Sequence, residues 1–227
     1  MSLLLLIQAV PQEAVEETQE VTIDYIQMAI SGGWIMIPLL LLSVISVYIF
    51  SERYFAIKRA SKVDDTFMNR IKDYIHDGKI DSALALCQSQ DTPIAHMIEK
   101  GITRIGRPLN DVNMAIENVG NLEISKMEKG LSVLATVAGG APMIGFLGTV
   151  IGMIRAFFDM ANAGNNIDVS LLSSGIYTAM VTTVTGLIIG IIAYFAYNYL
   201  VTRVDKVVHN MQAHALEFLD LLNEPAS

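Results

Sequence analysis

The chain has 227 residues, 52% of them hydrophobic, and a mean hydropathy of +0.46. This composition is more apolar than that of an ordinary soluble domain. The single cysteine excludes an internal disulfide and a thiolate cluster, and the formal net charge of −8, with no basic stripe, argues against nucleic-acid binding.

Residues 1–33 are expected to form a polar, acidic arm followed by a short helix in the membrane interface. Residues 8–20 are mostly polar. Apolar Ile23, Ile26 and Ile30 recur at helical spacing just before Trp34, a residue typical of headgroup level. Gly32 and Gly33 would form a hinge. The apolar run at 3–7 is short and has no basic residue before it, so it does not indicate a signal peptide.

Three segments are long and apolar enough to cross a bilayer, which takes roughly 20 residues. They are residues 34–54, 130–158 and 171–200. Pro38 falls in the first turns of the first segment, where a missing N–H costs least. The sequence therefore predicts an all-α membrane protein with three transmembrane helices.

The basic residues predict the orientation of these helices. No lysine or arginine precedes Arg53, twelve lie between Arg53 and Lys129, and none lies in residues 159–170. Basic flanks stay cytoplasmic. We therefore expect the N-terminus and the loop 159–170 outside, in the periplasm. Residues 55–129 and the tail 201–227 then lie in the cytoplasm.

Residues 55–129 are predicted to be helical. Residues 64–66 would cap a helix over 67–76, a short helix would follow over 81–88, and Thr92-Pro93 would open another reaching about residue 105. The sequence at 106–108 would end it. A helix that restarts near Asn110 is expected to run into the second span without a break.

The third span is also expected to continue past the membrane, over residues 201–222. Apolar residues recur there at alternating spacings of three and four, which is typical of a helix–helix seam. The members are Val201, Val204, Val208, Met211, Ala215, Phe218 and Leu222. Two partners fit the pattern equally: the cytoplasmic helices of the same chain, or a second subunit.

No catalytic, cofactor or metal site is expected. All four histidines fall outside the three spans, and none has an acid–histidine spacing typical of a metal site. The sequence also contains no phosphate-binding glycine loop and no nucleophile elbow. Cys87 is interpreted as a small buried apolar residue.

The second and third spans carry hydroxyls and small residues that a purely lipid-facing helix would not need. The small residues that would allow close helix approach are Pro142, Gly145, Gly148, Gly152, Gly186 and Gly190. The candidate ion-pathway residues are Thr149, Thr183, Thr178, Thr182 and Tyr177. A membrane threonine often returns its hydroxyl to the carbonyl four residues earlier, which is the alternative for each of them. Together they favour a hydrated seam.

Neither span has a carboxylate or a histidine near its middle. Arg155 and Asp159 lie in the outermost turns of the second span, where they would pair or reach headgroups. A threonine does not titrate near neutral pH. If protons cross here, the titrating acid must come from another chain.

These residues resemble the MotA/TolQ/ExbB proton-channel family. The likeness covers residue 32 to the tail and rests on three groups of residues. They are Gly33-Trp34 with Glu52-Arg53, then Ala141-Pro142-x-x-Gly145-x-x-Gly148-Thr149-Val150-x-Gly152, and then Gly175-Ile176-x-x-Ala179-x-x-x-Thr183-x-x-Gly186-Leu187 with Ala196-Tyr197-Asn198.

The resemblance implies a stator subunit of a proton-driven motor in the inner membrane of a Gram-negative bacterium. Such subunits form a homo-oligomer, a pentamer, around two copies of a single-span ExbD or TolR-like partner, whose membrane aspartate carries the proton. The motor couples proton flow to a TonB-like protein. Thr149 and Thr183 match the family's pore threonines that face that aspartate.

One position departs from the family. Thr178 stands where ExbB and TolQ proteins commonly carry a glutamate, so steps that depend on that glutamate do not transfer. Three alternatives stay open: a Tol-type envelope motor, a non-conducting scaffold that uses the small residues only for packing, and sodium in place of the proton. A flagellar MotA is disfavoured, since it has four spans and a larger cytoplasmic insert.

Overall fold

The computed structural model describes residues 32–62, 66–162 and 169–223. All of the regular structure in these residues is helical, and none of it is strand. Three of the helical stretches are long and apolar enough to cross a membrane. The expected arm and interfacial helix, residues 64 and 65 of the expected cap, and residues 163–168 of the expected loop 159–170 lie outside the described residues.

The first long helix is α2, Met36–Ala60, and a short 3-10 turn, Gly33–Ile35, leads into it. Gly33 has φ +68°, a backbone conformation that costs glycine little. Large apolar side chains along one face of α2 are exposed, Ile37, Val44 and Tyr48 among them. A helix with so much exposed apolar surface is suited to lipid.

Three short helices follow: α3, Phe67–His76, α4, Ile80–Gln88, and α5, Pro93–Ile102. The predicted helices over 67–76 and 81–88 are confirmed to within a residue, and the third ends earlier than 105. The Thr92 side chain accepts a hydrogen bond from the Ala95 N–H at 3.3 Å, as expected of an N-cap. Gly106 (φ +90°) lies in the break before the next helix.

The expectation of one unbroken helix from Asn110 into the second span is wrong. The structure has α6, Leu109–Glu128, and then α7, Leu131–Asn162, with Gly130 at φ +84° between them. In a continuous helix the Lys126 carbonyl would accept the Gly130 N–H. Here it accepts a hydrogen bond of 3.0 Å from Arg53 Nη1 on α2 instead. The hydrogen bond from Arg53 on α2 thus takes the place of the helical bond to the Lys126 carbonyl, and Gly130 tolerates the positive φ of the turn.

The last helix, α8, runs unbroken over Val169–Asn223, so the predicted continuation of the third span is confirmed. Its apolar seam packs on helices of the same chain: Val204, Met211 and Phe218 are at most 3% exposed. A Cβ added to Gly101 on α5 would lie 2.6 Å from the Phe218 ring, which shows how closely the two helices meet. Of the two partners expected for this seam, the structure shows helices of the same chain.

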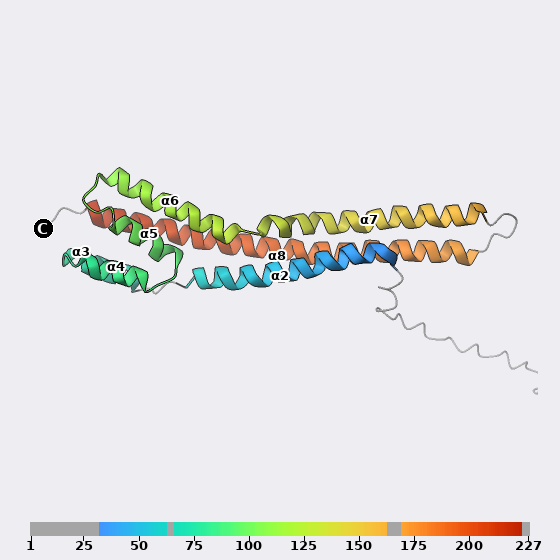
Figure 1. The fold of residues 1–227 in the computed structure, drawn as a ribbon, viewed down its shortest axis with the longest axis horizontal. Coiled ribbons are helices and arrows are strands. Elements are labelled where there is room, and N and C mark those ends of the chain that lie inside the picture. Colours follow the sequence, from blue (N-terminus) through green and yellow to red (C-terminus); the bar gives the residue numbers. More distant parts are fainter. Residues whose placement is uncertain (1–31, 63–65, 163–168, 224–227) are drawn as a thin grey trace, which may run out of the picture.

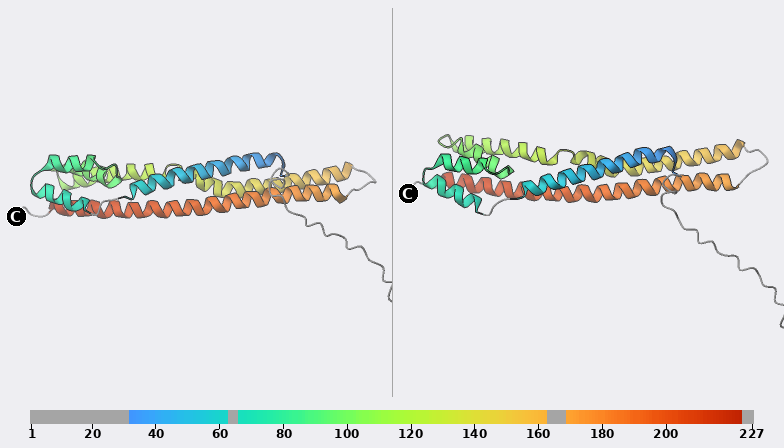
Figure 2. Two further views of the ribbon diagram at one scale, coloured as in Figure 1. Left: turned by 90° about the horizontal axis from the view of Figure 1, so that it is seen from below. Right: turned by 60° about the horizontal axis from the view of Figure 1, so that its bottom comes forward.

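The helices form one long bundle built along α8 (Figures 1 and 2). Along one half of α8 lie α2 and α7, and around the other half lie the short helices and α6. The most extensive contact is that between α7 and α8. Both predicted hydroxyl-bearing segments belong to this pair.

Candidate functional site

Small residues let α7 and α8 pack backbone to backbone. A Cβ on Gly145 would lie 2.9 Å from the Thr182 carbonyl oxygen, and one on Gly186 would lie 2.6 Å from the Ala141 oxygen. A Cβ on Gly152 would be 2.9 Å from the Ala179 Cβ. At these positions a larger residue would separate the helices.

The predicted packing residues all lie on this seam. Gly148 faces the Thr182 side chain, and Gly190 faces the Pro142 ring. A Cβ added to Gly190 would also lie 3.0 Å from the Ala138 carbonyl oxygen. Because proline has no N–H, Pro142 frees that carbonyl from its helical bond. Because Gly190 has no side chain, the α8 backbone can approach the Ala138 carbonyl closely.

Three threonine hydroxyls converge on the backbone carbonyl of Gly145. Thr183 donates to it from α8 at 3.0 Å, and Thr149 lies 3.3 Å from it, one turn along α7. Thr182 donates at 2.8 Å to the Ala179 carbonyl and lies 3.4 Å from that of Gly145. The backbone of one glycine thus gathers hydroxyls from both helices.

The hydroxyls of Thr149 and Thr183 also form a hydrogen bond with each other. Each hydroxyl has one hydrogen and two acceptor sites. Both bonds are satisfied when Thr149 donates to Thr183 and Thr183 donates to Gly145. Both side chains are half-buried. The acceptor sites of Thr149 can then take a hydrogen bond from water or from a protonated acid, but the pair itself holds no titratable group.

The other candidates are placed differently. Thr182 is 1% exposed between the helices, Tyr177 is 49% exposed, and Thr178 is half-buried. Thr185 donates to the Val181 carbonyl, four residues earlier, at 2.9 Å, which is the alternative that the sequence left open for each threonine. Among these candidates, Thr149 and Thr183 alone join hydroxyl to hydroxyl across the seam.

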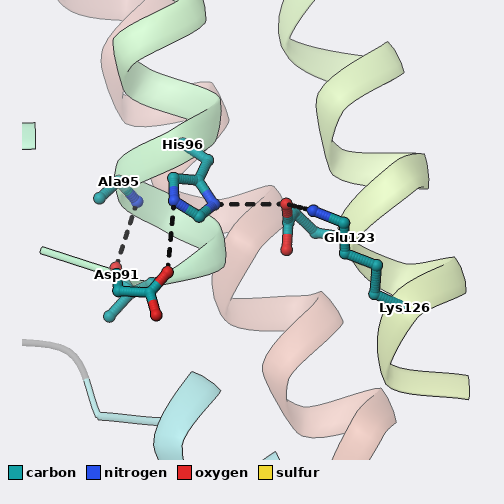
Figure 3. Close-up of polar contacts among 6 residues, drawn as sticks. Asp91, Ala95, His96, Glu123 and Lys126 are labelled. Carbon is teal, nitrogen blue, oxygen red and sulfur yellow. Dashed lines mark hydrogen bonds and ion pairs between the residues drawn. The ribbon is translucent and has the colours of Figure 1, made fainter. Parts of the chain in front are cut away.

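Sequence reasoning missed two features. The first is the sharing of the Gly145 carbonyl. Helical spacing indicates it as an acceptor for Thr149, four residues later, but its contacts with Thr182 and Thr183 depend on the helix crossing. The second feature is the polar contact between α5 and α6 in Figure 3, where His96 Nδ1 lies 3.3 Å from Glu123 Oε1 and Lys126 Nζ donates to the same oxygen at 2.7 Å. His96 Nε2 also lies 3.6 Å from Asp91. Glu123 is 8% exposed, so this network joins α5 to α6 at a mostly buried carboxylate.

Cys87, on α4, is fully buried, and burial raises the pKa of its thiol to about 12. A thiol with so high a pKa stays protonated and unreactive. Within the described part of the chain, no three histidine, cysteine, aspartate or glutamate residues are placed to hold a metal ion.

The fold and the seam together define a class: an all-helical membrane protein whose two closely packed spans join hydroxyls at a shared carbonyl. The sequence profile of the MotA/TolQ/ExbB proton channel family matches residues 89–213, more than half of the chain. The chain belongs to this family.

Individual relatives carry both ExbB and TolQ names. A protein of Methanothermobacter thermautotrophicus, named as a putative biopolymer transport protein ExbB homolog, is 29% identical over 191 residues, covering 82% of this chain and 66% of that protein. The Tol-Pal system protein TolQ of Pseudomonas aeruginosa is 26% identical over 200 residues, covering 83% and 86%. The biopolymer transport protein ExbB of Neisseria meningitidis is 23% identical over 208 residues, covering 85% and 93%. This chain spans about two thirds of the length of the Methanothermobacter protein.

Proposed function

We propose that this chain is an ExbB-like stator subunit of a proton-driven motor in the inner membrane of a Gram-negative bacterium. The observation that carries the proposal is the hydrogen-bonded pair of Thr149 and Thr183 at the Gly145 carbonyl. A pair of neutral hydroxyls on a half-buried seam can position water or an acid without holding a charge of its own. That suits a channel wall whose proton carrier sits on another polypeptide.

The carrier in this proposal is a membrane aspartate of an ExbD or TolR-like single-span partner. The chain forms a homo-oligomer, a pentamer, around that partner, with Thr149 and Thr183 facing it. Proton flow is passed on to a TonB-like protein that energises outer-membrane transport. Family membership and the lack of a carboxylate near the middle of the second and third spans support this division of labour.

A Tol-type envelope motor is the second candidate. It is favoured by the relatives named TolQ, one of which, from Haemophilus influenzae, is 35% identical over 106 residues, covering 47% of this chain and 46% of that protein. Thr178 gives no preference between the two candidates, because the glutamate that it replaces is common to ExbB and TolQ alike. Neighbouring genes separate them: a TonB-like gene beside a single-span partner supports the first, and a TolA-like gene supports the second.

The test is proton flux in liposomes that hold the chain with its single-span partner. The double variant Thr149→Val and Thr183→Val keeps the side-chain shape and removes both hydroxyls. At about 0.5–1.5 kcal/mol for each of the two lost hydrogen bonds, the flux should fall by roughly 5- to 150-fold. Thr185→Val is the matched control, since its hydroxyl returns to its own helix.

Two results would count against the proposal. Flux that is unchanged in the double variant would exclude the hydroxyl pair from the ion route. Flux that is absent from wild type under a proton gradient would favour the scaffold. Running the assay in sodium-free buffer distinguishes the coupling ion, because a proton motor keeps its flux there.

A further inference from the structure

A basic cleft of about 390 Å³ lies between the end of α2 and the middle of α8, away from the threonine pair. Its floor is apolar, formed by Ile57 at 3% exposure and Leu200, which is fully buried. Its rim carries positive charge. The cations are Lys58, Lys62, Arg203 and Lys206. None of the described residues that line the cleft is a carboxylate.

Two tyrosines place the cleft at the membrane surface. Tyr54 is the last residue of the first predicted span, and Tyr199 lies next to the last residue of the third. Their rings stack at 6.3 Å between centroids. The predicted ends of the first and third spans thus lie side by side, at the same depth in the membrane. Both carry tyrosine, which is typical of the headgroup region. The cleft therefore lies where lipid phosphates are found.

The arrangement holds one cation in position. Arg203 donates from Nε and Nη2 to the Tyr199 hydroxyl at 3.2 Å and 3.0 Å, and its guanidinium lies 5.2 Å from the ring centroid. A guanidinium has five N–H donors, so three remain beyond those two. Lys58 Nζ lies 5.8 Å from the Tyr54 ring centroid. The stacked tyrosines thus bring a guanidinium and an ammonium group to the same rim.

We propose that this cleft binds the phosphodiester headgroup of an anionic phospholipid in the leaflet that faces the basic segment. Basic pockets between membrane helices at this depth suit anionic headgroups. The bound lipid's acyl chains would lie along the apolar surface of α2, where Val47, Tyr48 and Phe55 are each more than 60% exposed. Inorganic phosphate could contact the basic side chains of the rim but has no acyl chains to pack on α2. A phospholipid makes both kinds of contact and is therefore the better ligand.

The inference rests on membrane insertion alone and not on the ion route, so either proposal can fail without the other. The experiment uses the full chain in a neutral maltoside detergent. Native mass spectrometry measures binding of phosphatidylglycerol, phosphatidylcholine and inorganic phosphate. The site variant is Arg203→Gln with Lys206→Gln. The control variant is Lys100→Gln with Arg107→Gln, which removes the same charge from exposed positions in and after α5.

Phosphatidylglycerol should bind wild type at least about tenfold more tightly than phosphatidylcholine, and the site variant should lose about tenfold in affinity while the control keeps it. Equal affinity for the two lipids would overturn the proposal. So would binding of inorganic phosphate as tight as that of the lipid, or an equal loss in both variants, which would indicate unspecific attraction. Circular dichroism checks that both variants fold; all four substituted side chains are exposed.

Discussion

Replacing Gly186 by alanine should force α7 and α8 apart. The new Cβ would lie 2.6 Å from the Ala141 carbonyl oxygen and 2.9 Å from the Gly145 Cα. Both atoms belong to the backbone of α7, so no side-chain rotation relieves the contact. Going from 2.6 Å to an ordinary contact of at least 3.4 Å requires a separation of about 0.8 Å at this point.

That separation is enough to break the hydroxyl cluster. Thr183 lies one turn from Gly186, and its 3.0 Å bond to the Gly145 carbonyl would stretch to about 3.8 Å, beyond hydrogen-bonding range. Overpacking costs about 1–3 kcal/mol and the lost bond about 1 kcal/mol. The expected loss is about 2–4 kcal/mol, or roughly 5–15 °C in the melting temperature of a chain of this size.

The assay is thermal unfolding in detergent, followed by proton flux with the single-span partner. Gly140→Ala is the matched control, because Gly140 lies on the same helix α7 and a Cβ there would meet nothing within 4 Å. It should leave the melting temperature unchanged or raise it slightly, since alanine is the better helix former. Equal melting temperatures for the two variants would refute the idea that backbone contact holds this seam.

Three further predictions concern the other helices. Cys87 should react with maleimide at pH 8 at least about 100-fold more slowly in the folded chain than in the unfolded chain, because a thiol with a pKa of about 12 stays protonated; equal rates would show that α4 does not bury it. Thr92→Ala should cost about 1 kcal/mol through loss of the N-cap of α5, with Thr103→Ala, beyond the end of that helix, as the control in thermal unfolding. Glu123→Ala should cost about 1–2 kcal/mol, whereas exposed Glu117→Ala should change the melting temperature little; similar losses would mean that the bonds to His96 and Lys126 do not stabilise the pair of helices.

Much of the fold follows from local sequence signals. Thr92-Pro93 marks the start of α5, because an N-cap is a local requirement. Gly106, at a positive φ, marks the turn before α6, although α5 itself ends at Ile102, before the predicted residue 105. The continuation of α8 follows from the apolar spacing of residues 201–222. The break at Gly130 could not be predicted, since an isolated glycine also fits inside a helix and the deciding bond comes from Arg53, 73 residues from its acceptor Lys126.

The candidate site, too, could be predicted from the sequence only in part. That Thr149 and Thr183 belong together came from the family resemblance, and that small residues pack came from composition. Thr178 and Thr182 were both predicted as ion-pathway residues, yet the structure buries Thr182 between the helices and leaves Thr178 half-buried. The pairing of the hydroxyls depends on the crossing angle and register of α7 and α8. The residue periodicity of a single helix predicts neither of these two quantities.

One continuous helix, α8, extends along the whole bundle. At 1.5 Å per residue its 55 residues span about 80 Å, with no proline or turn to absorb a bend. Thr183, between the two closely packed helices, and Phe218, which packs on Gly101 of α5, therefore stand on one continuous helix. The neighbouring α6 and α7 are instead separate helices that meet at Gly130, so the angle between them is not fixed by helical hydrogen bonds.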